Sequence, residues 1–294
     1  MAHYLIEQGY IPLDKSLLIR FGVLDLLEGY KDTIQFLYHQ KPLSNDLQSL
    51  YHASLDWNSG APVRVGESGT LYRFLKFACW KNGLNKNFLL SGTLRTRQIC
   101  NDPEIVNYSL KDLLKLDNGT SQWASASVLL GNEEIVENPP EKLKLTYEAV
   151  SHWKQRRAQR LSWEPRYDET ILGQAEAFIE LMKYGKTEFR PKHSEDACFA
   201  IGFGLMSIGE AENKWPSLRG HESNRTEEMK NMLLYADQGK DISSKDHRVV
   251  QAIAMRQKLD KEPVIIEHPK VVNKSWPQFW KFLEYSSGVR NTSS

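Results

Sequence analysis

The sequence has little of what marks membrane, secreted or nucleic-acid-binding proteins. No stretch approaches about 18 uninterrupted apolar residues, and the N-terminal MAHYLIEQGYIPLDKS lacks a basic segment followed by an apolar one. Lys plus Arg number 38 and Asp plus Glu 37, so the net charge of +1 gives no overall field for nucleic acid or an anionic membrane. We therefore expect a cytoplasmic protein with neither as a partner.

Cysteine and metal-binding patterns are equally scarce. Cys79, Cys100 and Cys198 are far apart and form no CxxC pair, which predicts free buried thiols in a reducing compartment. The eight histidines are scattered without an HExxH pattern, so we expect no metal. Neither a GxxxxGK[ST] nor a GxGxxG loop is present, so no motif supports nucleotide binding.

What the sequence does have is a recurring unit. A small or polar cluster precedes about ten residues whose apolar positions are three and four apart, and the average spacing of about 26 residues indicates internal repeats. Helix starts are predicted near Lys15, Leu43, Gly69, Arg97, Thr120, Leu145, Ile171, Glu195, Ser223, Asp246 and Trp276.

Short strands complete the units. Lys86–Leu90 and Val264–Glu267 are the strand candidates, which indicates an α/β class. The charged segment HWKQRRAQRLSWEPRYDE interrupts the spacing and is the best candidate for a domain crossing. Its first half fits one long amphipathic helix equally well.

Three clusters in the first half lie where helices are expected to begin. Lys15, Ser16 as a helix cap and Arg20 form the first cluster. Gly69, Thr70 and Arg73 form the second, and Thr120, Ser121 and Gln122 form the third. Each cluster fits either an anion site at a helix N-terminus or an ordinary cap.

The second half carries different chemistry. Asp196 lies at the start of an apolar helix, where burial can tune a carboxylate. His221, Glu222 and Arg225 fall within one turn, and Asp246, His247 and Arg248 mark another helix start. Capping for Asp196, and a solvated charged face for either of the other groups, are the alternatives.

Eight segments resemble, in order, motifs of one enzyme family. PLDKSLLIR resembles PGSKSxSNR, ESGTLYR resembles NAGTxxR, LSGTLRTRQI resembles TGxxxxRxRP, and DNGTSQ resembles DGSxSSQ. Further on, SEDAC resembles PDAA, HESNR resembles KETDR, KDHRVVQA resembles NDHRxAM, and KSWPQFWKFL resembles a KTFPxFW-like ending. Together they resemble the enolpyruvyl transferase family, closest to the enolpyruvylshikimate-phosphate synthases.

The resemblance implies a two-domain inside-out α/β barrel built from repeated small α/β units. The N-terminal repeat domain would span 13–158 and the C-terminal one 159–294, with residues 1–12 joining the latter and the active site in the cleft. One unit is shortened, because nothing here resembles the family's EGDxSSASYF segment.

The implied reaction transfers the enolpyruvyl group of phosphoenolpyruvate to a hydroxyl of shikimate 3-phosphate, in aromatic amino acid biosynthesis. It needs no cofactor, and we expect a monomer with small-molecule substrates as its partners. The resemblance places phosphoenolpyruvate on Lys15, Gly69, Gln122, Arg225, Arg248 and Lys274, plus Arg95 or Arg97. It assigns proton transfer to Asp196, Glu222, Lys15 and His247. The acceptor would contact Ser16, Arg20, Thr120, Ser121, Gln122, Asp196, Ser217 and His221.

Departures gather on the acceptor side. Pro139 and Lys142 replace two hydroxyl ligands, His221 replaces a lysine, and Glu67 replaces the asparagine of NAGT. Another phosphorylated acceptor is therefore one alternative. A paralogue that binds phosphoenolpyruvate or a sugar phosphate without turnover is a second, and a helical-repeat interaction protein is a third.

Overall fold

The computed structural model describes residues 1–40, 42–116, 121–131, 138–161, 164–219 and 224–288. The chain divides into two compact units, described separately below. The N-terminal unit is Leu13–Arg166, and the C-terminal unit combines Met1–Pro12 with Tyr167–Ser294. The implied boundary at 158 falls inside a continuous helix, Lys144–Gln159, whereas the observed division follows that helix.

The N-terminal unit is mostly helical around a small parallel sheet. Its elements are α2 (Lys15–Glu28), α3 (Asp32–His39), α4 (Asn45–Asp56), β1 (Val63–Gly66), α5 (Gly69–Lys81), β2 (Phe88–Leu90), η1 (Gly92–Arg95), η2 (Pro103–Asn107), α6 (Leu110–Leu116), α7 (Gln122–Leu130), η3 (Glu141–Leu143) and α8 (Lys144–Gln159). Val63 pairs with Phe88 and Arg64 with Leu89, and an irregularity precedes the Gly66–Leu90 pair.

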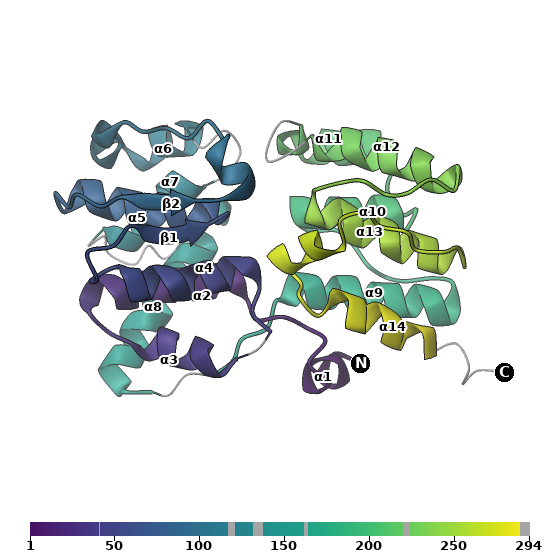
Figure 1. Ribbon diagram of the computed structural model, residues 1–294, viewed down its shortest axis with the longest axis horizontal. Coiled ribbons are helices and arrows are strands. Elements are labelled where there is room, and N and C mark those ends of the chain that lie inside the picture. The colour runs from purple at the N-terminus through teal and green to yellow at the C-terminus, as the bar shows by residue number, and fades with distance from the viewer. Residues whose placement is uncertain (41, 117–120, 132–137, 162–163, 220–223, 289–294) are drawn as a thin grey trace. The chain divides into compact units, whose positions relative to one another are not determined.

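Helix α2 is the centre of this unit. Its residues are buried from Leu17 to Leu26, and it packs against α3, α4, α5 and α8 (Figure 1). A helix that is apolar on all sides has to be enclosed on all sides, which its sequence already requires. Gly22 permits the closest approach, because a Cβ there would lie 2.6 Å from Cδ2 of Leu50 on α4.

The C-terminal unit has a core of its own. Its elements are α1 (Ala2–Glu7), α9 (Glu169–Tyr184), η4 (Ser194–Asp196), α10 (Ala197–Gly202), α11 (Ile208–Lys214), η5 (Pro216–Leu218), α12 (Arg225–Asp237), α13 (His247–Leu259), η6 (Pro269–Lys274) and α14 (Phe279–Gly288). Helix α13 is central and contacts α9, α10, α12 and η6 (Figure 1). An isolated parallel bridge joins Ile242 to Ile266.

The N-terminal segment packs into this second core. Leu5 of α1 is fully buried there, and the indole of Trp276 donates a 2.7 Å hydrogen bond to the carbonyl of Tyr10. The Tyr10 ring stacks on Tyr285, with centroids 4.9 Å apart. Residues distant in sequence therefore complete one hydrophobic core.

Most predicted helix starts are confirmed to within about two residues, the usual uncertainty of helix ends. The start near Arg97 is wrong, because η1 ends at Arg95 and the next helical turn begins at Pro103. Helices α3 and α6 were not predicted, and the first half of the charged segment is the end of α8. The inside-out α/β barrel stays a prediction.

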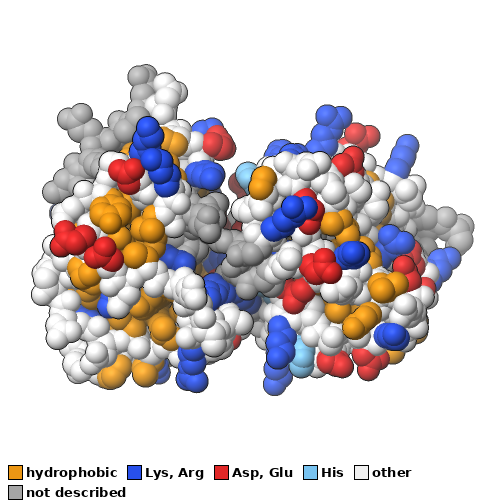
Figure 2. All heavy atoms as spheres, turned by 90° about the horizontal axis from the view of Figure 1, so that it is seen from above, with side chains coloured by type: hydrophobic (Ala, Val, Ile, Leu, Met, Phe, Trp, Pro, Cys, Tyr) orange, Lys and Arg blue, Asp and Glu red, His pale blue; other side chains and the backbone are white. Residues whose placement is uncertain are grey.

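The surface agrees with the balanced composition. In the view of Figure 2, basic and acidic side chains are interspersed on the surface of each unit. Among the described residues, every helix is too short or too polar to cross a bilayer.

Candidate functional site

The start of α2 holds the first predicted cluster. Asp14, rather than Ser16, is the N-cap: its Oδ1 accepts a 3.0 Å hydrogen bond from the amide of Leu17, so the predicted Ser16 cap is wrong. Burial raises the pKa of Asp14, although Arg20 and Arg166 oppose the shift. Lys15 donates to Asp46 Oδ2 at 2.8 Å, and its side chain is 16% exposed. A substrate anion at Lys15 would therefore share the ammonium with this carboxylate.

Arg20 lies inside the N-terminal unit and bonds to neutral oxygens. Its Nε donates to Thr146 Oγ1 at 2.9 Å, and its Nη1 donates to the carbonyl of Ser16 at 2.7 Å. Thr146 in turn donates to Ser125 Oγ at 3.0 Å, which links α2, α8 and α7. Burial lowers the pKa of Arg20 to about 10. The guanidinium is a buried positive charge whose hydrogen bonds go to uncharged groups.

The second cluster surrounds Gly69, at the start of α5. Gln122, the first residue of α7, donates to Thr70 Oγ1 at 2.9 Å and accepts a hydrogen bond from Arg73. Arg73 also donates to the carbonyl of Gly69 at 3.3 Å. Two helix N-termini that sequence separates by about fifty residues therefore meet at one arginine.

A glycine at position 69 lets a second arginine approach. A Cβ there would lie 3.1 Å from Nη1 of Arg73 and 3.2 Å from Nη1 of Arg97. Arg95, by contrast, is exposed and donates to the carbonyl of Leu90 at 2.8 Å. Of the two arginines left open by the sequence, Arg97 is the one at Gly69.

The remaining predicted residues of the N-terminal unit are less informative. Ser121 precedes α7 and donates to the carbonyl of Lys142 at 2.9 Å, whereas Thr120 lies outside the described residues. Glu67 is half-buried and its carboxylate packs against Gly92, where a Cβ would overlap it. Gly92 has a φ of 48°, so glycine suits both its backbone and its contact.

In the C-terminal unit, Asp196 is buried and held by three donors. Gln174 Nε2 donates to its Oδ1 at 2.9 Å, and the amides of Lys192 and His193 donate to its Oδ2 at 2.9 and 3.1 Å. The side chain belongs to a capping box at the start of η4, directly before α10. Asp196 therefore caps this helical turn, and its three donors fix the carboxylate in one orientation.

Arg225 and Arg248 join the starts of three helices. Arg225, first in α12, donates to Asp246 Oδ2 at 2.9 Å, and Asp246 caps α13 by accepting from the amide of Arg248 at 2.9 Å. The Arg248 guanidinium lies 3.0 Å from Glu195, beside Asp196. Both arginines are less than a tenth exposed. The N-termini of α10, α12 and α13 therefore converge on one ionic network, which is buried except at Glu195.

The pKa values of two neighbouring groups are raised in this part of the protein. Burial raises the pKa of Cys198 to about 12; Asp246 adds to that shift, and Arg225 and Arg248 oppose it. Burial also raises the pKa of Glu228, which accepts a 2.9 Å hydrogen bond from Ser244. Buried His247 has its Nδ1 3.9 Å from Asp246. These values describe a site of low polarity around fixed charges.

The other predicted residues of this unit vary. Lys274 is half-buried at the end of η6, which packs on α13 through hydrogen bonds of Gln251 to Val272 and Ser275. Ser217 is half-buried in η5, which contacts α11. His221 and Glu222 lie outside the described residues.

Sequence reasoning did not assign roles to several partners. Four residues without an assigned role bond to predicted ones, and each is 22 to 126 positions away from its partner in the sequence: Asp46, Thr146, Gln174 and Glu195. Arg73 belongs to the ESGTLYR motif, and its place one turn after Gly69 was the available signal. Within the described part of the chain, no three His, Cys, Asp or Glu side chains gather as metal ligands would.

Two curated proteins share short stretches with this chain. The 3-phosphoshikimate 1-carboxyvinyltransferase of Clostridium novyi (strain NT) is 46% identical over 44 residues, which is 15% of this chain and 10% of that protein. The one of Clostridium perfringens (strain SM101 / Type A) is 41% identical over 51 residues, 17% of this chain and 12% of its own length. The matches thus span about a tenth of each relative. No family model and no solved structure matches the chain.

Proposed function

We propose that the chain transfers the enolpyruvyl group of phosphoenolpyruvate to a hydroxyl of shikimate 3-phosphate and releases phosphate. Two partial relatives carry the name of this activity, and eight ordered motifs resemble the same family. The two-domain α/β arrangement of that family is part of the proposal.

The observation that carries the proposal is the pairing of arginines with Gly69. Arg73 and Arg97 bring two guanidiniums to the first residue of α5, whose N-terminus adds backbone donors and a partial positive charge. Arginine binds phosphate and carboxylate groups through two parallel hydrogen bonds, and phosphoenolpyruvate carries both groups. Arg225 and Arg248 would supply the cations of the C-terminal unit.

In the proposed reaction the methylene carbon of phosphoenolpyruvate takes a proton and the acceptor hydroxyl adds to the neighbouring carbon. The bond from that carbon to the phosphate oxygen then breaks, phosphate leaves with the bonding electrons, and loss of a methyl proton restores the double bond. Asp196 would take the hydroxyl proton, because its carboxylate has a fixed orientation. Glu222, Lys15 and His247 would assist proton transfer.

One contact favours the alternative of a different acceptor or a binding protein without turnover. Lys15, which the resemblance assigns to both substrate binding and proton transfer, already donates to Asp46 at 2.8 Å. Pro139 and Lys142 also lack the hydroxyl groups expected at the acceptor. In that case phosphoenolpyruvate would bind, and phosphate release would require another phosphorylated hydroxy compound or would not occur.

Phosphate release from phosphoenolpyruvate and shikimate 3-phosphate tests the proposal. Arg97→Ala should lower kcat/KM about a hundredfold, as expected for loss of a charged donor. Arg95→Ala is the matched control, because Arg95 is exposed and bonds to Leu90, and it should retain activity. Release by neither the wild type nor any variant, with phosphoenolpyruvate bound in calorimetry, would select the binding alternative. Equal loss in both variants would reject the Gly69 site.

A further inference from the structure

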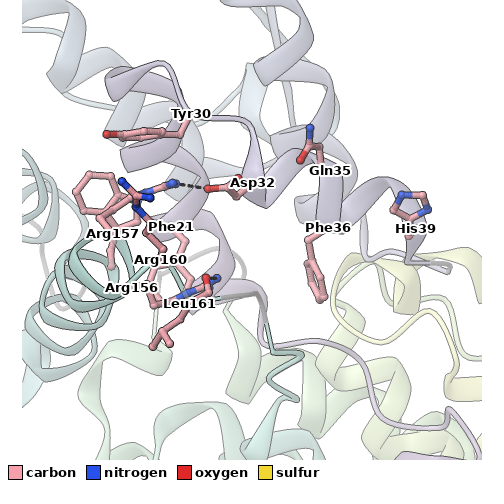
Figure 3. A pocket seen from close by; sticks show the side chains of 11 residues that line it. Phe21, Tyr30, Asp32, Gln35, Phe36, His39, Arg156, Arg157, Arg160 and Leu161 are labelled. Atoms are coloured by element: carbon pink, nitrogen blue, oxygen red, sulfur yellow. Dashed lines mark hydrogen bonds and ion pairs between the residues drawn. The ribbon is translucent and has the colours of Figure 1, made fainter.

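A cavity in the N-terminal unit is built from two facing helix stripes (Figure 3). Its volume is about 730 Å³, within the range of small-ligand pockets. Helix α3 contributes Asp32, Gln35, Phe36 and His39. Helix α8 contributes Trp153, Arg156 and Arg157, and Arg160 follows directly as its C-cap. The α3 residues follow the spacing i, i+3, i+4, i+7 and the three α8 residues the spacing i, i+3, i+4, which places each set on one face of its helix.

One wall of the cavity is fixed around Asp25, which is fully buried. Its carboxylate accepts from the amide and hydroxyl of Thr33 at 2.9 and 2.6 Å, from Trp153 Nε1 at 2.8 Å, and from Arg157. Arg157 also bonds to Asp32, and its guanidinium lies 3.7 Å from the centroid of the Tyr30 ring. Two carboxylates and a ring therefore hold Arg157 in place, so it shapes the cavity.

The other two arginines leave the cavity with excess positive charge. Arg156 donates to the carbonyl of Leu161 at 3.0 Å, and burial lowers its pKa while Asp25 opposes the shift. Arg160 is exposed, and within the described residues its guanidinium makes no hydrogen bond or ion pair. Three guanidiniums and the two carboxylates of Asp25 and Asp32 leave one positive charge in excess. Arg156 and Arg160 are the guanidiniums not bonded to those carboxylates, so an anion here would be attracted to them.

The backbone at Arg160 adds an independent reason. It caps α8 with a φ of 53°, in the left-handed region where glycine is the usual residue. Helices α2 and α9 end in the same conformation with Gly29 and Gly185. An arginine in a place suited to glycine, with its side chain lining a cavity, indicates a role for that side chain.

A ring surface completes the site. Phe36 is half-buried, and Figure 3 shows it standing apart from Arg156 and Arg160 in the cavity. We propose that this cavity binds a phosphate monoester bearing an aromatic or heteroaromatic ring, with the phosphate on Arg156 and Arg160 and the ring against Phe36. Arginine forks match phosphate geometry, and aromatic side chains bind rings by stacking. Side chains, rather than the backbone loop of a nucleotide motif, would read the phosphate.

Calorimetric titration of the full chain tests the site. The ligands are AMP, UMP and phenyl phosphate, which separate a purine, a pyrimidine and a simple aryl ring; adenosine and inorganic phosphate are the references. At least one ring phosphate should bind tenfold or more tightly than both references. Arg160→Gly should weaken it at least tenfold while the thermal midpoint stays equal or rises, because glycine adopts this φ readily.

The matched control is Lys261→Gly. Lys261 has a φ of 63° in the C-terminal unit, so this variant gives the same backbone relief without touching the cavity, and binding should not change. Phe36→Leu keeps apolar volume but removes the ring, and it should reduce the advantage over inorganic phosphate. The proposal is overturned if no ring phosphate exceeds the references, if Arg160→Gly binds as the wild type does, or if both glycine variants lose binding.

Discussion

The N-terminal and C-terminal units both gather basic side chains at helix starts, but they neutralise these charges differently. In the C-terminal unit, Arg225 pairs with buried Asp246, and buried Arg248 pairs with Glu195, whose side chain is 47% exposed. In the N-terminal unit, Arg20 and Arg73 donate to hydroxyl, amide and carbonyl oxygens. The same sequence pattern thus produces arginine–carboxylate pairs in the C-terminal unit, whereas Arg20 and Arg73 of the N-terminal unit donate to neutral oxygens. Lys15, which pairs with Asp46, is the exception in the N-terminal unit.

This difference has an energetic meaning. Removing one partner of a buried ion pair strongly destabilises a fold, because the other charge stays buried without a counter-charge. Arginines that donate to neutral oxygens keep most of their attraction for an external anion. We therefore expect the C-terminal network to maintain structure and the N-terminal cluster to dominate anion affinity.

Asp246→Ala should have the largest effect on stability. It removes the carboxylate bonded to Arg225 and the cap of α13, so the free energy of unfolding should fall by about 3–5 kcal/mol. Denaturant unfolding measures the loss, and hydrogen exchange should locate it in α12 and α13. Asp46→Ala in the N-terminal unit breaks the Lys15 pair, whose side chains are 16% and 10% exposed; because the Lys15 ammonium can still reach water, the loss should be smaller, about 1–2 kcal/mol. Equal losses would remove the contrast between the units.

The reactivity of the cysteine thiols is a second property that should differ between the two units. A pKa of about 12 makes the Cys198 thiolate roughly a thousandfold rarer than that of an ordinary cysteine near pH 8. Burial raises the pKa of Cys79 as well, whereas Cys100 is half-buried. Alkylation followed by mass spectrometry should label Cys100 first and Cys198 only after unfolding. Early labelling of Cys198 would show that the network opens in the native protein.

Two close-packed glycines compare the rigidity of the cores. A Cβ at Gly202 would lie 3.0 Å from the carbonyl oxygen of Ala252, whereas at Gly22 it would meet the side chain of Leu50. Backbone cannot rotate away, so Gly202→Ala should cost about 2 kcal/mol and Gly22→Ala about 1 kcal/mol. Gly173→Ala in α9 meets little and should stabilise by about 0.5–1 kcal/mol. Thermal and urea midpoints would measure all three.

The smallest expected effects are opposite pH dependences. The Arg64 hydrogen bond lowers the pKa of Asp56, so its contribution is present above pH 3.8 and is lost as pH falls through the lower folded value. Burial raises the pKa of Glu228, so stability declines as pH rises from 4.5 to its folded value. Asp56→Asn should flatten the acid limb of a stability profile, and Glu228→Gln the rising-pH limb. A shared sign for the two variants would contradict this.

Helix positions were the most predictable part of the fold, because apolar spacing and polar starts are local. Gly69 and His247 begin helices where the sequence places them. The short helices α3 and α6 were missed because their repeating apolar pattern covers only about two turns. Strand β1 was missed because its alternating pattern covers only four residues. The helix start predicted near Arg97 is wrong because the charged cluster there lies between two 3₁₀ turns, η1 and η2.

The motifs identified most charged residues of the candidate site but not how they pair. Arg225, Arg248, Asp246 and Asp196 stand in motifs, whereas nothing in the sequence indicated that Asp246 bonds to Arg225, or gave a role to Glu195 and Gln174, which bond to Arg248 and Asp196. The choice of Arg97 over Arg95 could not be made from spacing. It depends on which guanidinium the chain turns toward Gly69.

The sequence by itself determined where helices begin, which faces are apolar, and that basic residues stand at helix N-termini, because each depends on neighbours within a turn or two. The tertiary structure alone decided which charges are neutralised, which arginine reaches Gly69, and that Arg160 faces a cavity. Those outcomes depend on distances between segments that only packing brings together, and a few ångströms separate a buried ion pair from a site open to a ligand.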